Sequence, residues 1–376
     1  MRFTFSAPAS LLFVFLLGFF CPSQEPFQDK KVFASSVAFS PDGKYFAAGG
    51  RSPFDTKRKD AVQISVFEPG LKGVLKVWES HSGKEIWDLF DSDKKIRCLE
   101  FSPAGPFLAV CYRGSSQRLP VQRKTYPLIV WDVKTKEKKI VLPECCGYDC
   151  LAFSLDGKWL ATGSMVSLEE QSPESWFTLW EMPSGKEKHK TKLPGGTRSY
   201  PQLVDSLAFS PDNSTVAIGT YESDLFVFDL KTKKASKLIG AGPRSPTALA
   251  FSPDGKFLAF VSRENEVRVF NWGKRELVGK FSAYSHACTG VVFRPDSNML
   301  FTSGIEFDAE KKTTSGAWKA WAVPEGRLVF TGKTEAKPGS IAISPDGKKV
   351  LLGDPWGPVE LCNVPKELQM EKIKGK

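Results

Sequence analysis

Histidine is scarce in this chain, with three residues among 376. His81, His189 and His286 stand far apart, and none lies within a metal-ligand spacing of another. The sequence also has neither a phosphate-binding glycine-rich loop nor a Gly-x-Ser-x-Gly elbow. These absences argue against the familiar metal-dependent, nucleotide-dependent and serine-dependent enzymes. We therefore predict no catalytic residues, no metal site and no cofactor.

Long apolar runs are absent after the first twenty residues. At the start, Arg2 precedes an apolar run from Leu11 to Phe20, and polarity begins after it. Such a run is too short for a stable membrane span, which needs about 20 residues. The pattern indicates a signal peptide over residues 1–23 and an exported protein, periplasmic or extracellular. A retained anchor is one alternative, and a lipoprotein at Cys21 is another, disfavoured by bulky Phe20 before it.

Acidic residues are outnumbered: 52 lysines and arginines face 42 aspartates and glutamates, a formal net charge of +10. This balance favours a protein or another acidic macromolecule as partner, whereas nucleic acid suits an exported protein poorly. Much of the excess lies in three lysine runs, which we interpret as solvated edge strands protected by lysine. The runs comprise Lys134, Lys136, Lys138 and Lys139; Lys186, Lys188, Lys190 and Lys192; and Lys231, Lys233, Lys234 and Lys237.

One short phrase, of the type Leu-Ala-Phe-Ser-Pro-Asp-Gly-Lys, recurs seven times. Its aromatic or Ile position falls at Phe39, Phe101, Phe153, Phe209, Phe251, Phe293 and Ile343. Each copy predicts an apolar strand, a turn in which proline fixes φ, and a second strand. A third strand ends in an aromatic residue, as at Trp78, Trp131 and Trp180, and a more polar fourth strand follows. The repeats predict an all-β fold, a single seven-bladed β-propeller over residues 24–376 with four antiparallel strands per blade.

The first strand of each repeat also predicts how blades pack. Three places before the Phe or Ile stands a small residue in every copy: Ser36, Cys98, Cys150, Ser206, Ala248, Gly290 and Ser340. Alternation along a strand puts large and small residues on opposite faces. The bulky face of one blade can therefore nest against the small face of the next. Cys98 also stands on a strand adjacent to that of Cys111, and the two could bond only if the register places them opposite each other.

The Phe-Ser-Pro-Asp-Gly turns and the later Trp131-Asp132 pair resemble WD40 repeats, over about residues 32 to 373. The resemblance implies a propeller that binds other macromolecules, and says little about which ones. Only Ser285-His286 is similar to the family's usual Gly-His, so the buried hydrogen-bond network of many WD40 proteins is expected to be mostly absent. The pattern is closer to bacterial propellers, and TolB-like repeats are the nearest rival family.

Closure of the ring has two alternatives in the sequence. A strand from about Pro26 to Val32 could complete the seventh blade, or the stretch from Glu367 to Ile373 could do so. Either would remove the open edges of the ring. We expect a monomeric ring.

Four insertions separate second and third strands, between Gly50 and Gly73, Arg113 and Pro127, Ser164 and Ser175, and Gly304 and Gly316. Because successive strands are antiparallel, these insertions share one face, which we call the insertion face, and the Ser-Pro-Asp-Gly turns share the opposite turn face. We predict that binding occurs on the insertion face of blades 1 to 3. The candidate residues are Arg51, Lys57, Arg58, Lys59, Arg113, Arg118, Arg123, Lys124, Glu169 and Glu170. A hydrolase or lyase with its site at the mouth of the central channel is the alternative.

Overall fold

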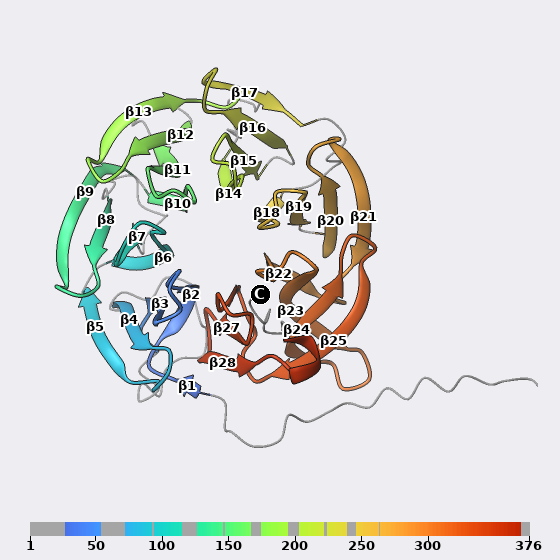
Figure 1. The fold of residues 1–376 in the computed structure, drawn as a ribbon. Coiled ribbons are helices and arrows are strands. Elements are labelled where there is room, and N and C mark those ends of the chain that lie inside the picture. Colours follow the sequence, from blue (N-terminus) through green and yellow to red (C-terminus); the bar gives the residue numbers. More distant parts are fainter. Residues whose placement is uncertain are drawn as a thin grey trace, which may run out of the picture.

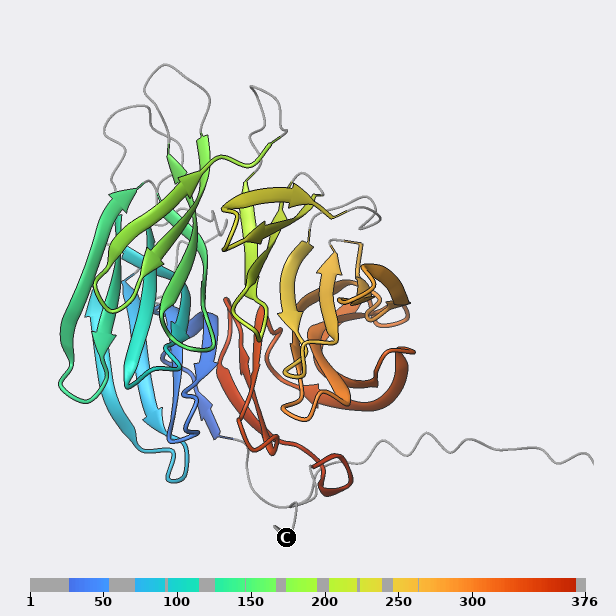
Figure 2. The ribbon, with the colours of Figure 1, turned by 45° about the horizontal axis from the view of Figure 1, so that its top comes forward.

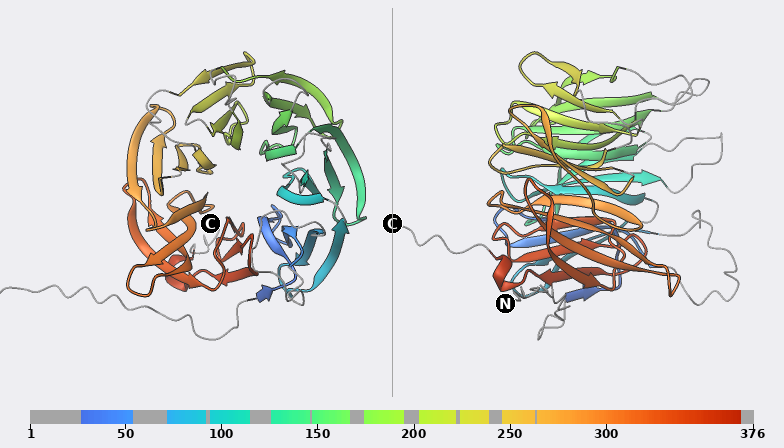
Figure 3. Two further views of the ribbon diagram at one scale, coloured as in Figure 1. Left: turned by 180° about the vertical axis from the view of Figure 1, so that it is seen from behind. Right: turned by 90° about the vertical axis from the view of Figure 1, so that its right-hand side faces the viewer.

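The computed structural model describes residues 27–53, 72–91, 94–114, 126–145, 147–166, 174–194, 203–221, 224–238, 246–262 and 264–369. Within these ranges the strands form seven four-stranded antiparallel sheets, arranged as blades around a central axis (Figure 1). The predicted seven-bladed propeller is confirmed. The tilted view in Figure 2 and the edge-on view in Figure 3 show the strands crossing the thickness of the ring.

Each blade runs from the axis outward. The innermost strands are β2 (Phe33–Phe39), β6 (Lys94–Phe101), β10 (Gly147–Phe153), β14 (Val204–Phe209), β18 (Pro246–Phe251), β22 (Ala287–Phe293) and β26 (Ser340–Ile343). The second strands are β3 (Tyr45–Arg51), β7 (Phe107–Gly114), β11 (Trp159–Val166), β15 (Thr215–Thr220), β19 (Phe257–Ser262), β23 (Met299–Asp308) and β27 (Lys349–Gly353). The third strands are β4 (Gly73–Glu79), β8 (Tyr126–Asp132), β12 (Glu174–Glu181), β16 (Leu225–Asp229), β20 (Glu266–Asn271), β24 (Thr313–Ala322) and β28 (Val359–Asn363). The outermost strands are β5 (Glu85–Asp91), β9 (Glu137–Cys145), β13 (Lys186–Thr191), β17 (Lys234–Lys237), β21 (Glu276–Ser282), β25 (Arg327–Thr334) and, for the seventh blade, β1 (Phe27–Asp29).

The repeated turn is held by a serine and an aspartate. In the first blade the Ser40 hydroxyl donates to Asp42 Oδ1 at 2.7 Å and accepts from the Tyr45 N–H at 2.9 Å. Burial acts to raise the pKa of Asp42, but the hydrogen bonds from Ser40 and from the Lys44 N–H outweigh it and lower the pKa. The same serine-to-aspartate bond occurs at Ser154–Asp156, Ser210–Asp212, Ser252–Asp254 and Ser344–Asp346. The phrase therefore recurs because each copy closes the same hairpin.

The small residues of the first strands lie between blades, as predicted. A Cβ on Gly290 would come 2.8 Å from Ile341 Cγ2 of the next blade. Some of these positions also bond: Ser206 Oγ donates to the Pro246 carbonyl of the next blade at 2.8 Å. In the second blade the register places Cys98 opposite Cys111, but no disulfide joins the two residues.

The N-terminal strand closes the ring. β1 pairs with β28, with Phe27 opposite Leu361, so the first of the two sequence alternatives is confirmed (Figure 1). Lys76 on β4 fastens this strand to blade 1. Its side chain is 1% exposed, and its ammonium lies 3.2 Å from Asp29 and 2.6 Å from Glu85. Although burial acts to lower the pKa of Lys76, these carboxylates raise it overall.

The C-terminal alternative does not form a strand within the described residues. Lys366–Leu368 form a 3-10 helix, η1. The Arg294 guanidinium, which replaces the usual serine of the turn, donates to the Leu368 carbonyl at 2.7 Å and holds this segment at the turn face.

One predicted insertion is wrong in its form. The stretch between Gly304 and Gly316 extends strands β23 and β24 into a long hairpin, in which Phe307 pairs with Thr314. Figure 3 shows this hairpin on the side of the ring opposite to η1. The two strands continue to pair as an antiparallel ladder as far as Asp308, so their backbone N–H and C=O groups are hydrogen-bonded along this stretch. The suggested extra hairpin around residues 61–67 lies outside the described residues.

Candidate functional site: the insertion face

Six of the seven innermost strands carry a β-bulge at the same place, near the end that faces the insertion side. The bulged residues are all polar: Ser35, Arg97, Asp149, Asp205, Thr247 and Thr289. A bulge re-aims a side chain and often lies beside a functional site. Ser35, Arg97, Asp205 and Thr247 line a central cavity of about 510 Å³. The ring thus presents polar side chains at the mouth of its channel.

This ring of bulged residues was not predicted, although the sequence carries a signal for it. Four places before each repeated Phe stands a polar residue in the first six repeats, and Gly339 in the seventh. That position does not stand out in a single copy. It becomes informative only when the seven copies are aligned and the position of the bulge is known.

A carboxyl also lines the channel wall. Glu100 occupies the position where the other blades have Ala38, Ala152, Ala208, Ala250, Val292 and Ala342. Burial raises the pKa of Glu100 to about 8, while a hydrogen bond from the Phe153 N–H acts in the opposite direction. Its side chain therefore bridges to the innermost strand of blade 3 and is a weak acid near neutral pH.

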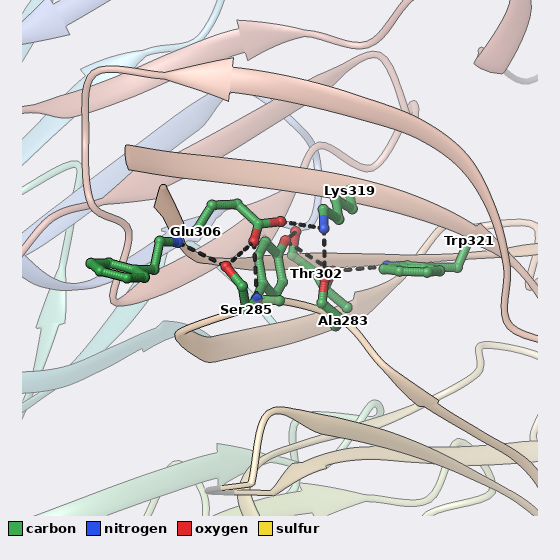
Figure 4. Close-up of polar contacts among 8 residues, drawn as sticks. Ala283, Ser285, Thr302, Glu306, Lys319 and Trp321 are labelled. Carbon is green, nitrogen blue, oxygen red and sulfur yellow. Dashed lines mark hydrogen bonds and ion pairs between the residues drawn. The ribbon is translucent and has the colours of Figure 1, made fainter. Parts of the chain in front are cut away.

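A partly buried ion pair braces the long hairpin of blade 6 (Figure 4). The Lys319 ammonium donates to the Ala283 carbonyl at 2.7 Å and to Glu306 Oε1 at 2.5 Å. The other oxygen of Glu306 accepts from the N–H and the hydroxyl of Ser285, at 2.9 and 2.6 Å. Burial alone would raise the pKa of Glu306, but the bonds from Lys319 and Ser285 lower it. The hairpin is therefore fixed to the strand-entry loop beside it.

The same region contains a buried hydrogen-bond chain of the kind expected to be mostly absent. Trp321 Nε1 donates to Thr302 Oγ1 at 2.9 Å, and the Tyr284 hydroxyl donates to the Thr302 carbonyl at 2.9 Å. Figure 4 shows Trp321 and Thr302 in this arrangement. Tyr284, directly before Ser285-His286, takes the inner position, whereas His286 is exposed. The network therefore contains no histidine, and the Ser285-His286 pair does not predict it.

Exposed aromatic side chains occur on the insertion face. Phe307 on the braced hairpin is 46% exposed, Trp356 between β27 and β28 is 52% exposed, and Tyr221 after β15 is 47% exposed. Aromatic residues are enriched at the centres of protein interfaces. None of the three was predicted, because side-chain exposure depends on the neighbouring blades.

Trp356 is held in place from two sides. Its backbone N–H donates to Asp354 Oδ1 at 2.8 Å, and the Arg51 guanidinium lies 3.9 Å from the centre of its ring. Asp354 is 4% exposed, and burial raises its pKa despite the N–H donors of Lys337 and Trp356. The indole is thus exposed and lies against the arginine, while the buried carboxylate holds the backbone of the same residue.

Arg51 is placed differently from its predicted location in an exposed loop. It is the last residue of β3, is 7% exposed, and donates through Nε and Nη2 to the Pro355 carbonyl at 3.3 and 3.1 Å. It therefore joins blade 1 to blade 7 and supports Trp356. Arg113 lies in β7, paired with Lys95. The remaining candidates lie outside the described residues and stay a prediction: Lys57, Arg58, Lys59, Arg118, Arg123, Lys124, Glu169 and Glu170.

The three histidines lie in different blades. His81 and His286 are exposed, and burial lowers the pKa of His189, whose ring lies 5.0 Å from Phe228. Across the described ranges there is no group of three or more His, Cys, Asp or Glu that could hold a metal ion. No helix in this part of the chain is long and apolar enough to cross a membrane.

The blades, the closed ring and the channel mouth define a β-propeller of the repeat type. A family model described as "WD domain, G-beta repeat" matches residues 27–53, from β1 to the loop after β3. The model of the anaphase-promoting complex subunit 4 WD40 domain matches residues 207–296, from β14 to β22. No curated protein matches the chain in sequence. Together with the seven blades, these matches show that the chain belongs to the WD40-repeat β-propeller family.

Proposed function

We propose that this propeller is a non-catalytic scaffold that binds a protein partner on its insertion face. The observation that carries the proposal is the set of exposed aromatic side chains on that face, two of which are held by buried polar groups. Trp356 rests on Arg51 and Asp354, and Phe307 is carried by a hairpin that Lys319 and Glu306 brace. Positioned aromatic residues lose little conformational freedom on binding, which makes them effective anchors.

The test compares removal of exposed apolar side chains on the two faces of the ring. The double variant Phe307→Ala/Trp356→Ala is matched with Leu155→Ala, which removes a 62% exposed side chain from a turn on the opposite face. Tagged wild-type and variant proteins are used to co-purify partners from the protein's own source, and captured proteins are quantified by mass spectrometry.

A partner retained by the wild type and by Leu155→Ala should fall at least about tenfold with the double variant, as expected for two interface anchors. Thermal unfolding of each variant separates this loss from misfolding. A partner captured equally by the double variant would contradict the proposal, and so would one lost only in Leu155→Ala.

The charged sector belongs to the same proposal. If the loops of blades 1 to 3 attract an acidic partner, reversal of Arg118, Arg123 and Lys124 to Glu should abolish its binding and leave the melting temperature nearly unchanged. Unaltered binding by this triple variant would remove the charged sector from the proposal and leave the aromatic anchors to be judged by their own test.

We also propose that the protein works outside the cytoplasm, as a periplasmic or extracellular protein whose signal is cleaved near residues 21 to 25. The support is the short apolar run before Cys21. Mass spectrometry of the exported protein should show a new N-terminus in that region, and an intact Met1 would contradict cleavage.

A further inference from the structure

Lysine is concentrated along the outer edge of blades 2, 3 and 4. The segments are residues 134–139, 186–192 and 231–237, which we call the basic rim. They contain twelve lysines and two glutamates, a net charge of +10, equal to the formal net charge of the whole chain. The remaining residues therefore balance to zero. All twelve lysine side chains are exposed.

The rim is continuous over three neighbouring blades. Its lysines lie on β9, β13 and β17 and in the turns that lead into these strands, and the three strands follow one another on the circumference (Figure 1). Outer strands elsewhere differ. β21 carries one lysine, Lys280, β25 carries Arg327 and Lys333 after a turn without lysine, and β5 carries Glu85 and Asp88. Edge protection alone would call for a similar number of lysines in every blade, so it does not account for this concentration.

The rim lysines already contact carboxylates of their own chain. Lys139 lies 2.9 Å from Glu137, and Lys188 lies 2.9 Å from Glu181. Others lie along aromatic surface, since Lys190 and Lys192 are 5.0 and 4.9 Å from the centre of the Trp176 ring. The ammonium groups are thus presented at the surface, in reach of carboxylates.

The shape of the rim selects among acidic partners. The rim is convex, because the outer strands of blades 2 and 4 face directions two sevenths of a turn apart. A flat lipid surface laid against the circumference would meet only part of it, whereas an extended chain can follow the curve. The outer strands are also the edges of their sheets, where an extended peptide can add backbone hydrogen bonds. An acidic strand would meet opposite charges there, and a lysine-rich one would be repelled.

We propose that the basic rim binds an extended, aspartate- and glutamate-rich segment of another polypeptide. This surface is separate from the insertion face, so its occupant can differ from the partner of the aromatic anchors. The rim would hold such a segment by charge along three blades, which makes binding salt-dependent and tolerant of sequence.

The test measures binding of fluorescein-labelled poly-L-glutamate by fluorescence anisotropy at low and moderate salt. The rim variant Lys134→Gln/Lys186→Gln/Lys234→Gln removes one charge from each blade. The matched control, Lys44→Gln/Lys256→Gln/Lys311→Gln, removes three lysines that are 71%, 72% and 77% exposed elsewhere on the ring. Both variants have the same net charge.

The rim variant should weaken binding about tenfold, since each exposed charge pair contributes modestly and three are lost. The control should change it less than about twofold, and Phe307→Ala/Trp356→Ala should not change it. Equal weakening by both lysine variants would show a general effect of net charge and overturn the proposal. So would tighter, rim-dependent binding of heparin or of anionic lipid vesicles, which would assign the surface to a different class of partner.

Discussion

Replacement of Glu100 by glutamine should remove a large part of the pH dependence of stability. Burial raises the pKa of this carboxyl from 4.5 to about 8, against the opposing effect of the Phe153 N–H. The folded protein therefore holds a proton that the unfolded chain releases. The contribution of Glu100 to stability is fully present below pH 4.5, falls as the pH rises toward 8, and levels off above it.

The magnitude follows from the two pKa values. Linkage gives a loss of about 3 kcal/mol in the free energy of unfolding between about pH 5.5 and 8.5. Glu100 lines an open channel and is only half-buried, so solvent screening reduces the expected loss to about 1 to 2 kcal/mol. Glutamine keeps the shape and an acceptor for the Phe153 N–H but carries no charge. The variant should gain about 1 to 2 kcal/mol relative to the wild type between these two pH values.

Urea unfolding followed by tryptophan fluorescence at both pH values measures this difference. The variant Glu276→Gln, at an exposed position on β21, serves as the control and should follow the wild type at each pH. Parallel curves for wild type and Glu100→Gln would refute the reasoning, because Glu100 would then titrate alike in the folded and unfolded states.

Three further substitutions test the packing of the ring by thermal and urea unfolding. Gly49→Ala should destabilise the protein by about 1 to 3 kcal/mol, because its Cβ would lie 2.6 Å from Ile96 Cγ2 of the next blade. The control Gly273→Ala, whose Cβ would lie 3.7 Å from the nearest atom, should change stability little, and equal effects of the two variants would contradict close contact between the blades. Lys76→Met should cost about 2 to 3 kcal/mol at neutral pH, since it leaves partly exposed carboxylates without their cation, and an unchanged stability would remove its role in closure. Phe27→Ala should cost about 2 kcal/mol through lost aromatic contacts across β1, and no change would mean that this strand contributes little to the closed ring.

The sequence predicted the fold because its signal is repeated. Seven copies of one phrase fix the number of blades, and the small residues at Ser36 and its equivalents fix which faces meet. The sequence did not decide which segment closes the ring, because β1 is only three residues long and has no pattern that distinguishes it from other short polar stretches. Only its pairing with β28 separates it from the C-terminal alternative.

The candidate site was less predictable, for reasons visible at particular residues. Arg51 looked like a loop residue because it follows Gly49-Gly50, yet β3 continues through it and the neighbouring blade buries it. Tyr284 escaped notice because the family pattern directs attention to histidine, while a tyrosine hydroxyl can fill the same role in a hydrogen-bond chain. Sequence spacing gives the type of residue on each face, but three-dimensional packing decides which side chains reach the surface.

The pairing of β1 with β28 also imposes an order of assembly. Phe27 and its partner Leu361 lie at opposite ends of the described chain, so the last sheet cannot be completed until nearly all of the chain has been synthesised. Until then, the six earlier blades form an open arc with an exposed edge at each end, which is the state most prone to join another copy. For the same reason, a pulling force on the N-terminal segment would detach a three-residue strand before it disturbed any complete blade, so the ring is expected to open at its seventh blade first.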